Sequence, residues 1–168
     1  MANRKVIYEA CFEDYLRTAG VPYVAVDEAK KALFAGVRLK SFDFVVYSAN
    51  GVNLLVDVKG RRFPYEHASG RRLENWTTRE DLESLTQWEE VFGSGFAGLL
   101  AFCYHLTRPE AAEGFEVVHL FRGEYYALVG VYRNAYADAA RPRSRAWNTV
   151  SVPTRTFREL VRPIRAFF

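Results

Sequence analysis

Residues 41–62 read SFDFVVYSANGVNLLVDVKGRR. Two runs rich in Val, Leu and Phe flank the dipeptide Asn-Gly, which between apolar runs is the strongest short-range signal of a β-hairpin. We therefore predict two antiparallel strands joined by a tight turn. The first strand would begin with Asp43, and the second would carry Asp57 and Lys59.

The length of the turn determines whether the two aspartates can meet. A two-residue loop at residues 50–51 would send Asp43 to the opposite face of the sheet from Asp57. A three-residue loop at residues 49–51, with a left-handed glycine in a bulge after a type I turn, would instead place Asp43 opposite Asp57. Lys59 lies two positions further on and shares the face of Asp57. The longer loop therefore brings two carboxylates and an ammonium group together.

Such a cluster is costly to bury, because adjacent carboxylates repel each other and lose hydration. A divalent ion removes this cost. Oxygen ligands from two aspartates, with no nearby His or Cys cluster, suit a hard ion such as Mg²⁺ or Mn²⁺. However, a D/E-x-K tripeptide also occurs by chance about once in a chain of this length, and strand ends often carry solvated charge. The residues alone leave both interpretations open.

The composition indicates a folded protein. With 168 residues and 49% hydrophobic content, residues 1–168 are predicted to form a single domain with a real core. The net charge is +3, and Arg outnumbers Lys, which favours bidentate contacts to phosphate or carboxylate. Cys11 and Cys103 are predicted to be buried free thiols. The absence of an apolar leader or a long apolar stretch predicts a soluble, cytoplasmic protein with no membrane partner.

Apolar residues at helical spacing predict a helix over residues 5–19. Glu9 lies at the margin of its apolar stripe, and Glu13 lies further round toward solvent. Glu9 is the acid better placed to face a cleft, with a surface glutamate as the alternative. A capping box starting at Thr77 predicts a second helix that ends at residue 92. Gln87 lies beside the buried stripe of that helix, where it either reaches the hairpin face or faces solvent.

The remaining elements follow from shorter patterns. Residues 93–98 match G-x-G-x-x-G, but they follow a helix and open a strand, so a dinucleotide site is rejected. We predict strands over residues 22–26 and 97–104, a helical turn or connector over residues 27–34, and a second hairpin formed by residues 115–121 and 125–133.

Two arginine-rich segments are candidates for contacts with nucleic acid. The first follows Lys59 and is predicted to be an exposed loop that contains Arg61, Arg62, Arg71 and Arg72. The second, residues 141–165, contains seven arginines and only one acid, and a capping box at Thr156 predicts a basic helix there. Trp147 adds a stacking surface. Phosphate contacts are expected from Arg155, Arg158 and Arg162, with a solvated surface as the alternative for both segments.

The order of these elements resembles the PD-(D/E)xK nuclease superfamily, which has the restriction-endonuclease-like fold. A helix with Glu9 precedes a strand, a strand with Asp43, a strand with Asp57-x-Lys59, a helix and a strand. Within this superfamily, the order of elements looks most like that of archaeal Holliday junction resolvase-type nucleases. The resemblance covers about residues 5–104. It implies an α/β fold with an α-β-β-β-α-β core and a mixed sheet flanked by helices, followed by a C-terminal β-hairpin and basic helix over about residues 105–168.

The resemblance also implies chemistry. Asp43, Asp57 and the Val58 backbone carbonyl would hold Mg²⁺ or Mn²⁺, Glu9 would hold it directly or through water, and Lys59 would position the attacking water. Glu13 and Gln87 are candidate supporting residues. The expected activity is metal-dependent endonucleolytic hydrolysis of DNA, with a structure-specific substrate as one option and a homodimer as the expected assembly. The sequence alone does not distinguish DNA from RNA as the substrate. Alternatives are a catalytically inactive nucleic-acid-binding module of the same fold and a small-molecule or protein-interaction domain.

Overall fold

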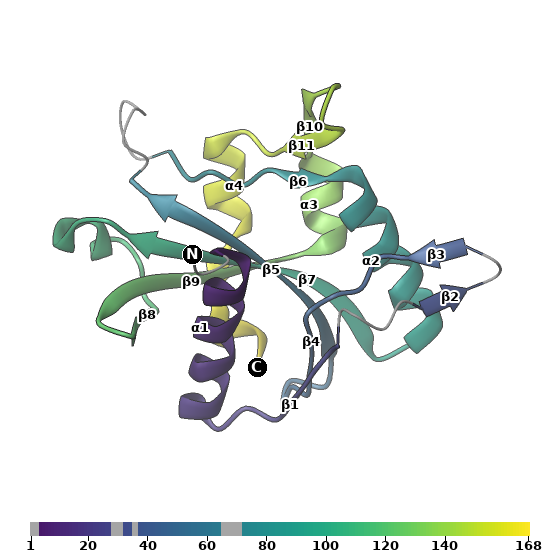
Figure 1. Cartoon of the computed structure of the whole chain (residues 1–168), viewed down its shortest axis with the longest axis horizontal. Coiled ribbons are helices and arrows are strands. Elements are labelled where there is room, and N and C mark those ends of the chain that lie inside the picture. Colours follow the sequence, from purple (N-terminus) through teal and green to yellow (C-terminus); the bar gives the residue numbers. More distant parts are fainter. Residues whose placement is uncertain (1–3, 28–31, 35–36, 65–71) are drawn as a thin grey trace.

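The computed structural model describes residues 4–27, 32–34, 37–64 and 72–168, which form a mixed α/β structure. Within these residues the main sheet contains seven strands in the order β1-β4-β5-β7-β9-β12, with β8 beside β9 (Figure 1). The central pair, β5 and β7, is parallel, and the other neighbours are antiparallel. The strands are β1 (Tyr23–Ala25), β4 (Phe44–Val46), β5 (Asn53–Phe63), β7 (Phe96–Leu106), β8 (Val118–Phe121), β9 (Glu124–Tyr132) and β12 (Arg162–Pro163).

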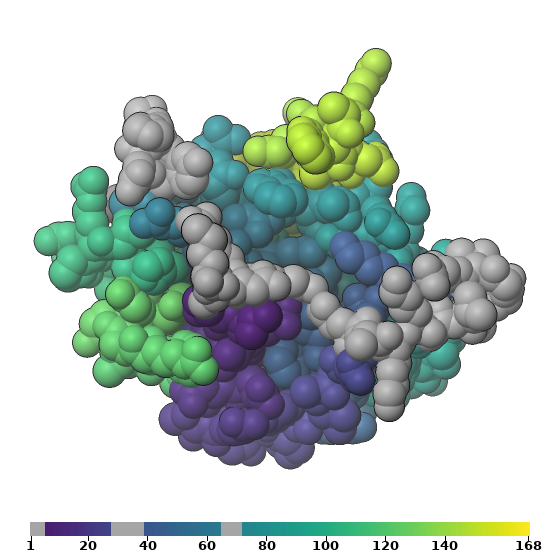
Figure 2. Space-filling model, viewed as in Figure 1, coloured from purple at the N-terminus to yellow at the C-terminus, as the bar shows by residue number. Residues whose placement is uncertain are grey.

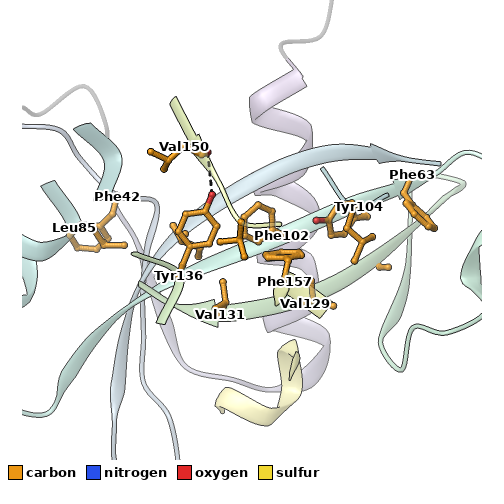
Figure 3. Close-up of a cluster of buried hydrophobic side chains, with 14 of the residues drawn as sticks. Phe42, Phe63, Leu85, Phe102, Tyr104, Val129, Val131, Tyr136, Val150 and Phe157 are labelled. Carbon is orange, nitrogen blue, oxygen red and sulfur yellow. Dashed lines mark hydrogen bonds between the residues drawn. The ribbon is translucent and has the colours of Figure 1, made fainter. Parts of the chain in front are cut away.

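Helices cover both faces of this sheet. One face carries α1 (Arg4–Ala19). The other carries α2 (Arg79–Phe92), α3 (Arg133–Ala139) and α4 (Thr154–Leu160), which contribute Leu85, Tyr136 and Phe157 to the core shown in Figure 3. Because both faces are buried, the central strand β7 is apolar almost throughout instead of alternating with polar residues.

The β4–β5 hairpin has the register of the longer predicted loop. Phe44 pairs with Val56 and Val46 with Leu54, and Asp43 directly precedes this paired segment, with its main-chain N–H donating to the Val56 carbonyl at 2.9 Å. Gly51 has φ 87°, the left-handed conformation that the three-residue loop requires. The three-residue alternative is therefore confirmed.

Strand β5 is longer than predicted. Residues 60–63 continue it and stay paired with β7, so the exposed loop predicted directly after Lys59 is wrong. Gly60, within this continuation, is a site of close approach: a Cβ on Gly60 would lie 1.9 Å from Cδ2 of Tyr8 on α1. The predicted continuation of the loop over residues 65–71, including Arg71, lies outside the described residues.

Two further local predictions are corrected. Residues 32–34 form β2 (Ala32–Phe34), which pairs with β3 (Val37–Leu39), and not a helical turn. Short apolar runs do not distinguish helix from strand, so tertiary pairing decides. The N-cap of α2 is Thr78, one residue later than predicted, and α4 begins at Thr154, which places the expected cap Thr156 inside the helix.

The C-terminal part joins the main structure in two ways. The predicted second hairpin is present as β8–β9 and extends the main sheet. A separate three-stranded sheet, not predicted, consists of β10 (Arg141–Ser144), β11 (Thr149–Ser151) and β6 (Thr77–Thr78). Because β6 leads directly into α2, this small sheet ties the C-terminal part to the start of that helix.

The predicted order of core elements is found as α1-β1-β4-β5-α2-β7, with the β2–β3 hairpin and β6 as insertions. Cys11 and Cys103 are buried free thiols, as predicted. None of the helices in the described ranges is long and apolar enough to cross a membrane.

Candidate active site

Asp43, the last residue before β4, fills a gap in the sheet beside β5. Its main-chain N–H donates to the Val56 carbonyl at 2.9 Å, but its carboxylate accepts the next hydrogen bond, from Val58 N–H at 2.6 Å. In an antiparallel strand the N–H and C=O of one residue point to the same side. The Val58 carbonyl therefore faces the same gap as the carboxylate of Asp43, a residue that is only 5% exposed.

An ion cluster lies on the sheet face that α2 covers. The Lys59 ammonium is 3.0 Å from Asp57 Oδ2 and 2.7 Å from Asp81 Oδ2. All three side chains are 14% exposed or less. Asp57 and Lys59 alternate along β5 with Val56 and Val58, which pack on the α1 side. The cluster and α1 therefore occupy opposite faces of the sheet.

The first turn of α2 positions Asp81. The Thr78 hydroxyl caps the helix by accepting from the Asp81 N–H at 3.1 Å, and the Thr77 hydroxyl donates to Asp81 Oδ2 at 3.2 Å. In a capping box the acid at this position reaches back to the cap. Here Asp81 Oδ1 instead pairs with the Lys40 ammonium, while Oδ2 binds Lys59. The first turn of α2 thus places a third carboxylate, in addition to those of Asp43 and Asp57, next to β5.

Lys40 is held by its main chain as well as by its ammonium. Its N–H donates to Ser84 Oγ at 3.3 Å, and its carbonyl accepts from the Trp88 indole N–H at 2.9 Å. Both partners lie on α2. With its side chain 44% exposed, Lys40 is the outermost cation of the cluster.

The two charged partners stabilise each other's ionised forms. Burial alone would lower the pKa of Lys59, but Asp57 and Asp81 raise it above its ordinary value. Burial alone would raise the pKa of Asp81, but Lys59 and Lys40 lower it well below the ordinary range. Lys59 is therefore an ammonium and Asp81 a carboxylate at neutral pH.

The predicted helical acids lie on α1. Glu9 is half-buried on α1, and α1 approaches β5 from the face opposite to Asp57 and Lys59. Glu13 accepts hydrogen bonds from Arg17 and Tyr23, near the other end of α1. Gln87 is half-buried on α2.

The predicted nucleic-acid-binding arginines divide into two groups. Arg61 is an internal residue: it donates to the Gly60 and Trp76 carbonyls and lies 4.1 Å from the centroid of the Trp76 ring. The others in the described residues are exposed, namely Arg62, Arg72, Arg155, Arg158 and Arg162.

The oxygen donors of Asp43, Asp57 and Val58 are of the type that suits a hard ion in a water-rich site. Asp43 and Asp57 supply carboxylate oxygens and Val58 a carbonyl, and Mg²⁺ in proteins usually takes one or two carboxylates and keeps several waters. Among the described residues, no group of three or more His, Cys, Asp or Glu is gathered closely enough to hold a metal. A closed cage made of protein side chains alone is therefore not formed by that part of the chain.

Sequence reasoning missed Asp81 and Lys40. Each is remote in sequence from the Asp57-x-Lys59 segment, and only the packing of α2 over β5 brings them to it. The signal that could have indicated Asp81 is an acid three residues after the cap, on the helix expected to cover this face. Lys40 has no comparable signal, since a lysine before a strand is ordinary.

Comparisons with known proteins support the fold. No family model matches the chain, and no curated protein does. Among solved structures, the chain is similar to Hjc, a Holliday junction resolvase from the archaeal hyperthermophile Archaeoglobus fulgidus. The TM-score is 0.54 at 14% identity, and the match covers 92% of this chain and 93% of that one. The chain therefore has the restriction-endonuclease-like fold that its order of elements predicted.

Proposed function

We propose that the chain is a nuclease that hydrolyses phosphodiester bonds in DNA with Mg²⁺ or Mn²⁺. One observation carries the proposal: the Asp43 carboxylate lies beside β5 where β4 begins and accepts from the Val58 N–H at 2.6 Å, while the Lys59 ammonium lies 3.0 Å from Asp57. The fold supports it, because the similar structure is that of a Holliday junction resolvase.

Phosphodiester hydrolysis needs an activated water, neutralisation of the charge that develops on phosphorus oxygens, and help for the leaving oxygen. A bound divalent ion would supply Lewis-acid stabilisation and lower the pKa of a bound water. Asp43, Asp57 and the Val58 carbonyl would hold it. Glu9 would act through water rather than directly, because α1 lies on the other face of the sheet.

Lys59 would act as a fixed positive charge. Two carboxylates, those of Asp57 and Asp81, hold its ammonium in one place on the buried face. A preorganised cation beside the reacting phosphate stabilises the transition state without reorganisation at the moment of reaction. Asp81 is a positioning residue in this scheme, because it touches Lys59 and not the phosphate.

A second candidate is a nucleic-acid-binding module that does not cleave. The observation that favours it is the balance of the cluster: Lys59 and Lys40 offset the charge of Asp57 and Asp81 without an ion. In that case Mn²⁺ would bind no more tightly to the protein than to an Asp57→Asn variant, whereas a nuclease site requires a measurable difference by calorimetry.

The test is incubation with linear, branched and single-stranded DNA, and with RNA, in Mg²⁺ or Mn²⁺. We expect cleavage of at least one DNA and a loss of about a hundredfold or more in Asp57→Asn, the scale of removing a transition-state-stabilising group. Glu83→Gln, an exposed acid on α2, is the matched control and should keep full activity. Cleavage unaffected by Asp57→Asn, or no cleavage of any substrate, would overturn the proposal.

For the assembly we propose a homodimer, following the resemblance to resolvase-type nucleases. Sedimentation equilibrium on the full chain would test it, and a purely monomeric species over the micromolar range would contradict it.

A further inference from the structure

The β10–β11 hairpin presents a single large aromatic side chain to solvent. Trp147 is 78% exposed, more than any other large apolar side chain among the described residues. Two hydrogen bonds hold the turn that carries it. The Trp147 N–H donates to Ser144 Oγ at 3.3 Å, and the Asn148 N–H donates to the Arg145 carbonyl at 3.2 Å. Figure 2 shows this hairpin, in yellow-green, projecting from the molecular surface.

The surroundings of this side chain are cationic. Arg141, Arg143 and Arg145 lie on the hairpin and are exposed, and the sequence contains no Asp or Glu from residue 139 to residue 158. At the base of the hairpin lies a small cavity of about 110 Å³, whose lining includes three arginines, Arg72, Arg141 and Arg143, and one acid, Glu74. The exposed tryptophan and the arginines of the hairpin together suit a ligand that has an aromatic ring and a negative charge.

The hairpin is rigidly tied to the candidate active site. Strand β11 pairs with β6, and the Asn148 carbonyl accepts from the Arg79 N–H at 3.0 Å. Arg79 is the first residue of α2, and Asp81, two residues later, binds Lys59. A ligand on the hairpin would therefore be held at a fixed position relative to the ion cluster.

Arginines around an exposed aromatic side chain form a stacking platform for nucleic-acid bases. Bases inside a duplex are stacked on their neighbours and offer no free face, whereas bases at single-stranded segments, branches and ends do. We propose that Trp147 stacks on an unpaired base of the DNA, with Arg141, Arg143 and Arg145 contacting adjacent phosphates. This inference rests on the proposed function and narrows its substrate to DNA that contains unpaired bases near the cleaved bond.

The test uses the full-length protein with DNA in which a single strand extends from a duplex, with 2-aminopurine in the unpaired part. Binding is measured in EDTA, so that cleavage does not occur. We expect Trp147→Ala to lose about 5- to 100-fold in affinity, the range of one base–aromatic stack, and to lose quenching of the 2-aminopurine fluorescence. Trp147→Phe should retain most of both, and affinity for a closed circular duplex should stay unchanged in all variants.

Tyr125→Ala is the matched control, because Tyr125 is an aromatic residue 53% exposed on the β8–β9 hairpin. It should leave affinity and quenching unchanged. Equal binding and quenching by the wild-type protein and Trp147→Ala would overturn the inference, as would a failure of the wild-type protein to bind either DNA, which would point to a protein partner. If Trp147 stacks on the base but the protein does not cleave DNA in Mn²⁺, the nuclease proposal is contradicted and the stacking site is still supported.

Discussion

Two hairpins contact the start of α2, and they differ in where their charged side chains lie. The β4–β5 hairpin buries its charges and pairs them: Asp57 and Lys59 are 14% and 13% exposed and lie 3.0 Å apart. The β10–β11 hairpin leaves its arginines in solvent around an exposed Trp147. Buried charges hold a fixed geometry because each depends on its partner, whereas exposed cations keep their attraction for an external anion. The first arrangement suits chemistry and the second suits binding.

If this contrast is correct, the largest loss of stability should follow from removing one partner of the buried cluster. Asp81→Ala leaves Lys59 and Lys40 without a shared carboxylate, and we expect a loss of about 3 kcal/mol in the free energy of unfolding. Denaturation in urea measures it. Glu80→Ala, the exposed neighbour on the same helix turn, is the matched control and should change stability by about 0.5 kcal/mol at most. Equal losses of unfolding free energy in the two variants would contradict the contrast between buried and exposed charges.

Steric packing on the other face of β5 should give the next largest effect. Gly60→Ala introduces a Cβ that would lie 1.9 Å from the Tyr8 ring, and we expect a loss of about 1–3 kcal/mol. In a Tyr8→Ala background the same substitution should cost less, since the clash is gone. Urea denaturation of the four proteins gives the coupling energy, and additive effects would contradict the close contact.

Acid should weaken the buried cluster. The folded pKa of Asp81 is lowered by Lys59 and Lys40 relative to the ordinary value of 3.8. A lowered folded pKa contributes stability that is fully present above the unfolded pKa and is lost as the pH falls through the folded one. The difference in unfolding free energy between the wild-type protein and Asp81→Asn should therefore shrink when the pH is lowered from about 7 to about 3. A difference that stays constant would contradict the assignment.

The exposed arginines of the C-terminal part should affect binding with almost no effect on stability. Arg155 is 94% exposed and its Nε lies 3.4 Å from the exposed carboxylate of Glu159, whereas the Arg162 guanidinium donates to the Glu159 and Val161 carbonyls. We expect Arg155→Ala to weaken DNA binding for all sequences alike and to reduce the salt slope by about one, more than Arg162→Ala does. Titrations at several salt concentrations measure both slopes. A larger effect from Arg162 would mean that its carbonyl contacts open on binding.

The hairpin that carries the site could be predicted from sequence, but its surroundings could not. A left-handed Gly51 and the twofold alternation of a strand are local rules, and they give the observed β4–β5 register and the shared face of Asp57 and Lys59. Asp81 reaches Lys59 only because α2 packs over β5, a relation between residues 22 positions apart that no local pattern encodes. The burial of Arg61 against Trp76 was missed for the same reason.

The β10–β11 hairpin, in contrast, could not be predicted from the sequence at all. Its strands consist of Arg, Pro, Ser and Thr with a single Val, so there is no alternation of apolar residues from which to predict a strand. The strands form because β11 pairs with β6. Long-range pairing, and not propensity, determines this element.

The central claim is that Lys59 serves the chemistry of phosphodiester cleavage and not merely the stability of the cluster. The most direct measurement is single-turnover cleavage of DNA in saturating Mn²⁺ by the wild-type protein and by Lys59→Gln, which keeps a hydrogen-bond donor to Asp81. We predict a loss of about a hundredfold or more in the cleavage rate, with Mn²⁺ and DNA affinities close to those of the wild-type protein. A Lys59→Gln protein that cleaves at the wild-type rate would contradict the account.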